Sequence, residues 1–257
     1  MKKHYTFVAN WKMYLTFDEI TEYATKNLDN FIKLSSYQDV TIIICPSLIA
    51  VYHLTQMFKD TLVQIGAQDC SNHQRGAFTG QVSASSLRQI GCSACIIGHS
   101  ERRKYQKESN EDVSQKLDML IDQKISPIIC VGETLEEYQA GRTTDVLEFQ
   151  LEKIFEIIES KKNLCEKMPI CIAYEPVWAI GKDKCAPPDY IDTILTWLNI
   201  KTQKQAKTLL WRILYGGSIT SENILSLKKI EVIDGFLIGG ASIDFPEFEK
   251  IVKYIIE

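Results

Sequence analysis

Ile172-Ala173-Tyr174-Glu175-Pro176-Val177-Trp178-Ala179-Ile180-Gly181 is a short apolar run that stops at a carboxylate. The proline that follows ends a strand, because it has no backbone N–H with which to continue a hydrogen-bonded ladder. The segment after the proline carries a bulky aromatic residue and a terminal glycine, as a hinged loop does. We therefore expect Glu175 to lie at a strand end, where such a loop can cover it and exclude water.

Short apolar runs of this kind recur along the chain. They are rich in Ile, Val and Tyr and continuously apolar, as strands buried on both faces should be. The stretches between them are long enough for crossover helices, and hydroxyl residues three positions before an acid mark helix starts at Thr16, Ser109 and Thr134. The predicted strands are Tyr5–Ala9, Val40–Cys45, Val63–Ala67, Ala94–Ile97, Pro127–Val131, Ile170–Tyr174, Arg212–Tyr215 and Gly235–Ile238.

Eight strands alternating with eight helices predict an α/β fold with a parallel sheet. Eight such units in 257 residues match the size of a closed (β/α)8 barrel, here a single domain over residues 1–257. An open doubly wound sheet is the alternative, and it should carry a glycine-rich turn after its first strand. The first strand is followed by Asn10-Trp11-Lys12, without glycine, so the closed barrel is favoured.

Composition restricts the class of protein. The net charge is −4 and no dense basic run occurs, which argues against a nucleic-acid partner. No apolar segment is long enough for a signal peptide or a membrane span, so we expect a cytoplasmic protein without a membrane partner. The eight cysteines predict reduced, mostly buried thiols. Cys92 and Cys95 form a lone CxxC that lacks a second pair, so we expect a structural role and no metal site.

One connection is unusually long. Residues 69–81 read Asp-Cys-Ser-Asn-His-Gln-Arg-Gly-Ala-Phe-Thr-Gly-Gln, whereas most strand-to-helix connections have about two to six residues. A polar loop of this length is either disordered or packed against another surface. Phe78 at its centre favours docking, and a second subunit is one possible partner.

Polar residues capable of chemistry follow three of the predicted strands. In a barrel, active sites lie where the strands end. Glu175 can remove a proton from carbon, His99 can polarise a carbonyl, and Lys12 can hold an oxyanion or a phosphate. Glu101 is expected to pair with Arg102 or Lys12 and to support the site rather than to react.

Glycines at the last strand ends suggest an anion site. The seventh strand is followed by Gly216-Gly217-Ser218 and the eighth by Gly239-Gly240-Ala241-Ser242, and Gly181 lies in the loop after Glu175. Free backbone N–H groups in such turns bind anions, and barrels often hold a phosphate between their last two strands. Two adjacent glycine turns are stronger evidence than one.

Together these residues resemble the triosephosphate isomerase family over nearly the whole chain. The family's motifs occur in order as Asn10-Trp11-Lys12, Gly98-His99-Ser100-Glu101-Arg102-Arg103, Cys130-Val131-Gly132-Glu133, Ala173–Gly181, Tyr215-Gly216-Gly217-Ser218 and Gly239-Gly240-Ala241-Ser242. The resemblance implies a TIM barrel that interconverts dihydroxyacetone phosphate and glyceraldehyde 3-phosphate, in glycolysis and gluconeogenesis, without metal or cofactor. It implies the following roles: Glu175 as base, His99 as electrophile, Lys12 and Asn10 as electrostatic partners, and Gly181, Ser218, Gly239 and Gly240 as phosphate ligands.

The resemblance also implies a homodimer, in which Phe78 and Thr79 insert into the neighbouring subunit and Arg102 lies at the interface. Gln81 stands where the family has a glutamate that pairs with this arginine across the dimer, so that ion pair should be absent. The lid continues from Gly181 as Lys182-Asp183-Lys184 instead of the family's Thr-Gly-Lys, and Tyr14 replaces an asparagine. These departures bear on lid closure and dimer strength rather than on the reaction.

Two other functions compete with this one. A sugar-phosphate aldolase of the Schiff-base type needs a buried lysine at a strand end, and Lys12 is the only lysine so placed. The sixth strand ends instead in Glu175, which favours proton transfer. A non-catalytic binding protein is the second alternative, and it would have no need for a base, an electrophile and a lid together.

Overall fold

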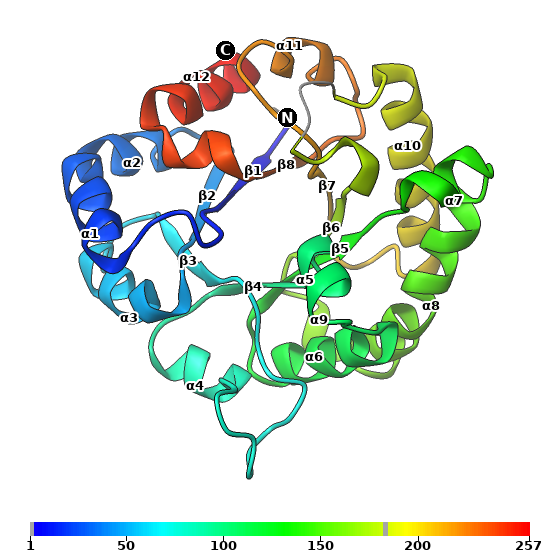
Figure 1. Cartoon of the computed structure of the whole chain (residues 1–257), viewed down its shortest axis with the longest axis horizontal. Coiled ribbons are helices and arrows are strands. Elements are labelled where there is room, and N and C mark those ends of the chain that lie inside the picture. The colour runs from blue at the N-terminus through cyan, green and yellow to red at the C-terminus, as the bar shows by residue number, and fades with distance from the viewer. Residues whose placement is uncertain (1–2, 182–184) are drawn as a thin grey trace.

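The chain folds into a closed barrel of eight parallel strands surrounded by helices (Figure 1). In this computed structural model the described residues are 3–181 and 185–257. Each strand pairs with the next along the chain, and β8 returns to pair with β1, which confirms the closed (β/α)8 TIM barrel and excludes the open sheet. The strands are β1 Tyr5–Asn10, β2 Val40–Cys45, β3 Gln64–Ala67, β4 Ala94–Ile97, β5 Ser126–Val131, β6 Ile170–Tyr174, β7 Trp211–Tyr215 and β8 Gly235–Ile238.

The outer layer contains more helices than the eight predicted. Several crossovers contain two helices instead of one. In the first crossover, Asn27 caps both the end of α1 and the start of α2. The helices of the described residues are α1 Phe17–Lys26, α2 Leu28–Ser35, α3 Leu48–Met57, α4 Ala84–Gln89, α5 Ser100–Tyr105, α6 Asn110–Asp122, α7 Leu135–Gln139, α8 Thr143–Ser160, α9 Lys162–Cys165, α10 Pro188–Gln205, α11 Ile224–Leu227 and α12 Phe245–Ile256, with 3₁₀ turns η1 Val177–Ala179 and η2 Gly240–Ile243. None of these helices combines the length and the apolar character that crossing a membrane requires.

Three helix starts are fixed by the hydroxyl residues singled out in the sequence. Thr16, Ser109 and Thr134 each accept a hydrogen bond from the backbone N–H three residues on, and the acid at that position reaches back to the cap. This reciprocal arrangement satisfies backbone donors that would otherwise lack a partner. The prediction is confirmed at all three positions, including Ser109, whose partner is the shorter side chain of Asp112.

The strands are buried on both faces, as their continuous apolar sequences predict. Alternate side chains fill the barrel interior, where Val8, Ile96 and Leu214 belong to one apolar cluster. The remaining strand side chains pack outward against the helices, with Leu147, Leu151, Ile154 and Ile158 of α8 among the contacts. Because each strand is held on both sides, the residues at its carboxyl end project from a rigid support.

The cysteines are free thiols. All are buried except Cys185, which is partly exposed. In the CxxC, Cys92 donates a hydrogen bond to the Ala94 carbonyl at 3.1 Å, and burial raises the pKa of Cys92 to about 12. Such thiols are protonated at neutral pH, which suits packing rather than thiolate chemistry.

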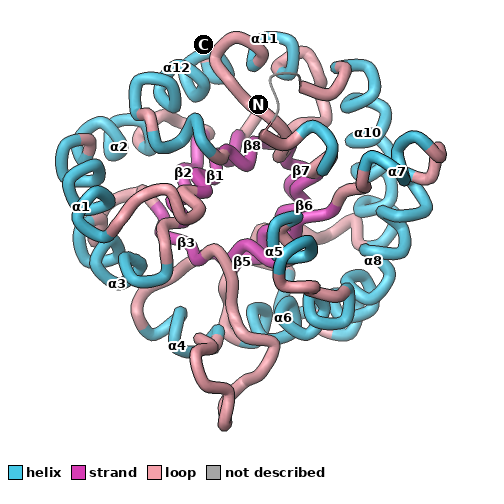
Figure 2. Tube along the Cα trace, in the orientation of Figure 1, coloured by secondary structure: helices cyan, strands magenta, loops and turns pink. Residues whose placement is uncertain are grey.

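The connection from β3 to α4 projects away from the barrel (Figure 2). At its tip the rings of His73 and Phe78 stack with centroids 3.7 Å apart. The Ser71 backbone N–H donates to the Val82 carbonyl at 2.8 Å, which closes the neck of the loop. The connection is therefore an ordered projection whose two ends are joined.

Candidate active site

The site begins at β1, where the backbone of Lys12 adopts a left-handed conformation. Its φ is 47°, a region that non-glycine residues seldom occupy. The Lys12 carbonyl accepts hydrogen bonds from Gln68 at 2.8 Å and Ser47 at 3.2 Å, and its N–H donates to the Asn10 side chain at 3.1 Å. These three neighbours hold the unusual conformation and direct the ammonium group over the end of the barrel.

Two ionisable side chains meet at the ends of β4 and β6. His99 Nε2 lies 3.0 Å from Glu175 Oε1, and both side chains are almost fully buried. The second oxygen of Glu175 accepts the Ser100 backbone N–H at 3.1 Å. Both oxygens of the predicted base are therefore occupied in this structure, and the carboxylate must turn away from Ser100 to reach a ligand.

Glu101 connects Lys12 to His99. Its carboxylate accepts a hydrogen bond from Lys12 Nζ at 2.7 Å, which confirms the predicted ion pair. Its backbone N–H donates to His99 Nδ1 at 3.2 Å. Because Nδ1 accepts this hydrogen bond, the proton of a neutral imidazole belongs on Nε2, the atom that faces Glu175.

The contact between His99 and Glu175 shifts the pKa values of both side chains. Burial raises the pKa of the Glu175 carboxyl, but His99, the Ser100 N–H and Lys12 outweigh it, and the net pKa lies below its usual value. Burial lowers the pKa of His99, and the charge and hydrogen bond of Glu175 raise it to a net value above its usual one. The raised pKa of His99 therefore depends on where the Glu175 carboxylate points.

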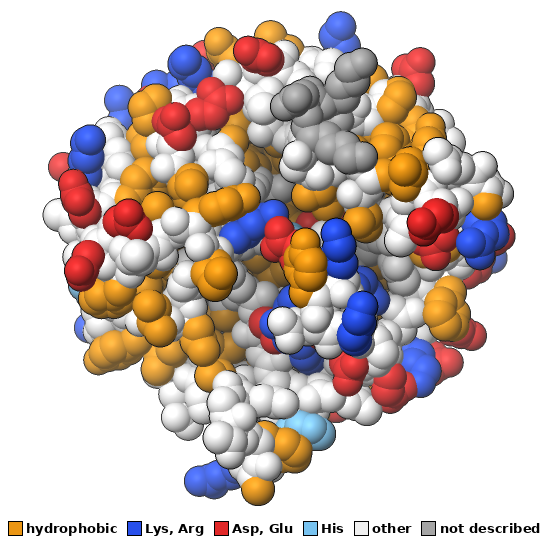
Figure 3. All heavy atoms as spheres, in the orientation of Figure 1, with side chains coloured by type: hydrophobic (Ala, Val, Ile, Leu, Met, Phe, Trp, Pro, Cys, Tyr) orange, Lys and Arg blue, Asp and Glu red, His pale blue; other side chains and the backbone are white. Residues whose placement is uncertain are grey.

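A cavity of about 790 Å³ opens beside these groups, and it includes the predicted phosphate residues. The face viewed in Figure 3 is hollowed near its centre, with charged side chains at the rim. Asn10, Lys12, His99 and Glu175 line the cavity together with Gly181, Ser218, Gly239 and Gly240. The Ser218 hydroxyl donates to the Ala179 carbonyl at 2.9 Å, which joins the β7 loop to η1. Residues 182–184, the altered part of the lid, lie outside the described residues.

Two glycines in the cavity wall lie close to the side chains of Glu175 and Lys12. A Cβ on Gly216 would lie 2.9 Å from Glu175 Cγ, and one on Gly239 would lie 3.3 Å from Lys12 Cε. Any larger residue would push against the base or the ammonium group. The glycine turns that we predicted as an anion site thus also leave room for the side chains beside them.

Glu133, at the end of β5, has a role that its place in the sequence does not reveal. It is completely buried, and its carboxylate accepts hydrogen bonds from Tyr174 and Tyr190 at 3.1 Å and from Trp178 Nε1 at 2.7 Å. Burial raises the pKa of Glu133 above its usual value, although the three donors lower it. Since Trp178 belongs to η1, this buried carboxylate holds the first part of the predicted lid.

Cys185 is a second residue of the site to which the sequence assigned no role. It lines the cavity, and its Sγ lies 3.1 Å from the Tyr215 hydroxyl. Tyr215 ends β7, so this contact ties the chain just beyond the undescribed lid residues to the barrel. Nothing in the spacing of the cysteines distinguishes Cys185 from the buried thiols.

The residues predicted at a subunit interface lie apart from the cavity. Phe78 and Thr79 are exposed on the projecting β3–α4 loop, and neither lines the cavity. Arg102 pairs within its own chain, with Asp69 at 2.8 Å and Glu108 at 3.4 Å. Its charge is therefore compensated within the chain by two carboxylates.

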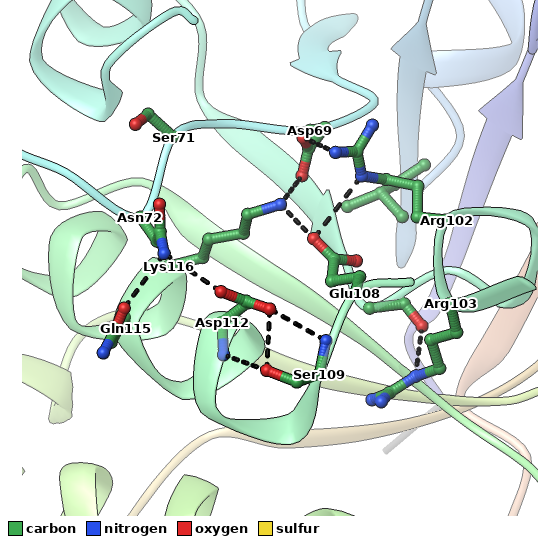
Figure 4. A network of polar contacts seen from close by, with 12 residues as sticks. Asp69, Ser71, Asn72, Arg102, Arg103, Glu108, Ser109, Asp112, Gln115 and Lys116 are labelled. Carbon is green, nitrogen blue, oxygen red and sulfur yellow. Dashed lines mark hydrogen bonds and ion pairs between the residues drawn. The ribbon is translucent and has the colours of Figure 1, made fainter. Parts of the chain in front are cut away.

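Arg102 belongs to a network of ion pairs beneath the projecting loop (Figure 4). Lys116 is its centre, hydrogen-bonded to Asp69 at 2.7 Å and also to Glu108. Burial lowers the pKa of Lys116, but the two carboxylates raise it to a net value above its usual one. We call Asp69, Arg102, Glu108 and Lys116 the support network. It borders a polar cavity of about 530 Å³, and within the described residues Glu108 Oε2 has no hydrogen-bond partner.

Comparison with known proteins identifies the family. The model of the family described as triosephosphate isomerase matches residues 5–255. The triosephosphate isomerase of Aquifex aeolicus (strain VF5) is 40% identical over 252 residues, covering 95% of this chain and 96% of that protein. The triosephosphate isomerase of Dichelobacter nodosus (strain VCS1703A) is 41% identical over 247 residues, with the same two coverages. That of Endomicrobium trichonymphae is 38% identical over 248 residues, covering 96% of each chain. On this evidence the chain is a member of the triosephosphate isomerase family.

Proposed function

We propose that this isomerase interconverts dihydroxyacetone phosphate and D-glyceraldehyde 3-phosphate by proton transfer through an enediolate, as a step of glycolysis and gluconeogenesis. The observation that carries the proposal is one cavity lined by a carboxylate, an imidazole, an ammonium group and glycine turns. The membership of the family supports the same substrates. Eight free thiols suit the reducing cytoplasm, where we place the reaction.

The first step requires Glu175 to turn from Ser100 into the cavity. There its carboxylate removes a proton from the carbon next to the substrate carbonyl. The electrons of that C–H bond form a carbon–carbon double bond, and the carbonyl oxygen takes the negative charge of an enediolate. Returning the proton to the neighbouring carbon, with transfer of a hydroxyl proton between the two oxygens, completes the isomerisation without net loss of atoms or electrons.

His99 and Lys12 act on the charge that develops. Once the Glu175 carboxylate has turned away, the main cause that raises the pKa of His99 is lost, and burial and Lys12 favour the neutral imidazole. Its Nε2–H can then donate to the oxygen that becomes negative, while Lys12 Nζ supplies positive charge. Asn10 holds the backbone of Lys12, and Glu101 holds the ammonium group and the imidazole in place.

The phosphate of the substrate belongs among the glycine turns of this cavity. Gly181, Ser218, Gly239 and Gly240 line it, and backbone N–H groups in such turns bind anions. Gly181 has a φ of 65°, which a glycine adopts without strain, so this part of the lid can present its N–H to an anion. The binding energy of the phosphate would then hold the reacting carbon against Glu175.

We further propose that the chain works as a homodimer. Large apolar side chains are exposed around the projecting loop, and hydrophobic side chains gather over α1 and α3 in Figure 3. They include Met13, Tyr14, Phe17, Leu48, Ile49, Tyr52 and Phe78. Surfaces of this kind mark protein–protein contacts. A partner loop seated among them would bring Phe78 and Thr79 to the polar cavity beside the support network and brace the left-handed Lys12.

Removing the base tests the proposed reaction. Glu175→Gln keeps the size of the side chain but cannot accept the proton. Turnover in a coupled isomerase assay should fall about a thousandfold, since a well-placed general base contributes about 10² to 10⁴. Affinity for a phosphate-bearing enediolate analogue should stay within about tenfold, because the phosphate contacts remain.

The matched control is Glu136→Gln, which changes an exposed acid of α7. It should leave both turnover and affinity unchanged. A Glu175→Gln protein that keeps a tenth of the normal turnover would contradict the role of Glu175. A wild-type protein without isomerase activity would contradict the function itself.

A further inference from the structure

A groove on the outer wall of the barrel, between α8 and α10, has no part in the proposed reaction. Its volume is about 1210 Å³, and it shares no lining residue with the active-site cavity or with the cavity beside the support network. Its apolar part comes from Phe149, Phe155 and Trp197. Phe149 is 68% exposed although it lies in the middle of a long helix. Figure 1 shows α8 and α10 beside each other on the far side of the barrel from α1 and α3.

The exposed position of Phe149 is not explained by the packing of the barrel. Leu147, Leu151, Ile154 and Ile158 already form the buried face of α8. Phe149 points away from that face, and its ring makes no aromatic contact within the described residues. Phe149, Phe155 and Trp197 gather in one groove, and apolar side chains gathered in this way are a feature of binding surfaces.

One wall of the groove is strongly acidic. Five carboxylates recur along α8 at intervals of three, four, four and three residues, and therefore share one face of the helix. They are Asp145, Glu148, Glu152, Glu156 and Glu159, and all five line the groove. The opposite wall contributes two cations, Lys201 and Lys204 of α10. Five carboxylates against two ammonium groups leave the groove with a net charge of −3.

The lysines do not neutralise the middle of the acidic face. Lys201 pairs with Glu148 at 2.5 Å and lies over the Trp197 ring, 5.1 Å from its centroid. Within the described residues, Glu152 and Glu156 have no ion pair, although they are four residues apart on one helix. Like charges at that spacing repel each other. A cationic partner would relieve this repulsion.

We propose that this groove binds a basic amphipathic helical segment of another protein. Apolar side chains of that segment would cover Phe149 and Trp197, and its lysines or arginines would face Glu152 and Glu156. Because the carboxylates repeat at helical spacing, a helix that carries cations at the same spacing matches several of them at once. The inference does not depend on the isomerase reaction.

A designed peptide tests the groove directly. The probe is a fluorescein-labelled helix of about 18 residues, built of leucine and lysine with all leucines on one face. Fluorescence anisotropy should show saturable binding of one peptide to each chain, weakened by added salt because charges contribute. The same peptide with glutamate in place of lysine should not bind.

Variants locate the binding site. Glu152→Lys together with Glu156→Lys should weaken binding of the basic peptide about tenfold or more, since close charge pairs at interfaces contribute strongly. Phe149→Ser tests the apolar contact and should weaken binding several-fold. The control is Glu166→Lys with Glu231→Lys, which makes the same change of charge at two exposed acids outside the groove and outside the proposed dimer surface. Isomerase activity checks that every variant is folded.

Three results would overturn the proposal. The first is absence of binding to the wild-type protein. The second is an equal loss of affinity in the control with Glu166→Lys and Glu231→Lys, which would mean that the peptide responds only to net charge. The third is a change of oligomeric state caused by Phe149→Ser in sedimentation, because the groove would then be a contact between copies of this chain.

Discussion

The active site and the support network both hold buried charges of opposite sign, but they hold them in different ways. In the support network, Lys116 bridges two carboxylates that are supplied by the same subunit. At the active site, His99 and Glu175 are each other's partners, and Lys12 has a left-handed backbone beside an open cavity. In the first arrangement each charged group forms ion pairs with other members of the network, although Glu108 Oε2 has no hydrogen-bond partner among the described residues. The second arrangement can exchange its contacts for a substrate.

This difference separates stability from catalysis. A buried ion pair that loses one member leaves an uncompensated charge, which strongly destabilises the folded state. A charged group aimed into a cavity is retained for what it does to the transition state. Substitutions in the two regions should therefore fail in different assays, one in unfolding and the other in turnover.

Among the substitutions that test this comparison, Lys12 should show the largest effect. Lys12→Met keeps the length of the side chain but removes the positive charge from the cavity. We expect kcat/KM to fall about 10² to 10³, the loss seen when a group that stabilises a developing oxyanion is removed. The urea-unfolding midpoint should change little, because Glu101, the partner of Lys12, is partly exposed. An unchanged kcat/KM would show that Lys12 does not act on the reaction.

Lys116→Met should instead lower stability and leave turnover nearly unchanged. The side chain of Glu108 is 3% exposed, and removing the ammonium group leaves it and Asp69 with less compensation. We expect the free energy of unfolding to fall by about 3 to 5 kcal/mol. The raised pKa of Lys116 means that its contribution is fully present below its ordinary pKa, and hence at neutral pH.

Urea unfolding measures this change, and the double variant Lys116→Met with Glu108→Gln is the control. It removes the uncompensated charge as well, so it should be more stable than the single variant. Turnover of whatever fraction stays folded should be close to that of the wild type. A Lys116→Met protein that is fully stable but inactive would contradict the proposal that the support network serves stability and the active site serves catalysis.

The projecting loop provides a test that connects the two regions. Phe78→Asp places a charge where the proposed dimer needs an apolar side chain. Sedimentation at micromolar concentration should show more monomer than in the wild type, and specific activity should fall with the dimer content. Arg102 should not make this effect strongly dependent on salt, since its ion pairs are within the subunit. A fully active monomer would contradict the dimer proposal.

The smallest effect concerns Glu133 and pH. Its pKa in the folded state lies above the ordinary 4.5, so the folded protein binds this proton more tightly than the unfolded chain does. Stability should therefore fall as pH rises from 4.5 through the raised pKa, by at most about 1.4 kcal/mol per pH unit. Urea unfolding of the wild type and of Glu133→Gln over this range isolates the effect, because the glutamine does not titrate. Parallel pH profiles would show that Glu133 does not contribute in this way.

The sequence was informative where local pattern decides the structure. Eight continuously apolar runs predicted the barrel, and the proline after Glu175 predicted where β6 ends. Because parallel strands of a barrel end on one face, those strand ends also predicted that Lys12, His99 and Glu175 meet. For Glu101 the sequence left Arg102 and Lys12 open as partners, and the structure shows the pair with Lys12.

The sequence was less informative where contacts join distant parts of the chain. Glu133 is 41 residues from Tyr174 and 57 from Tyr190, and neither spacing predicts a shared hydrogen bond. The support network likewise joins Asp69 to Lys116 across 47 residues. The division of the first crossover at Asn27 was missed because the residues on both sides of it favour a helix. Such features depend on packing that only the folded chain defines.

Isomerisation in deuterated water tests the central claim most directly. If Glu175 carries the proton between the two carbons through an enediolate, the carboxyl proton exchanges with solvent, and the product gains deuterium at the carbon that is reprotonated. Proton NMR of glyceraldehyde 3-phosphate formed from dihydroxyacetone phosphate should therefore show solvent deuterium at carbon 2, formed at a rate that falls about a thousandfold in Glu175→Gln. Formation of the product by Glu175→Gln at the wild-type rate, with or without deuterium, would contradict proton transfer by this carboxylate.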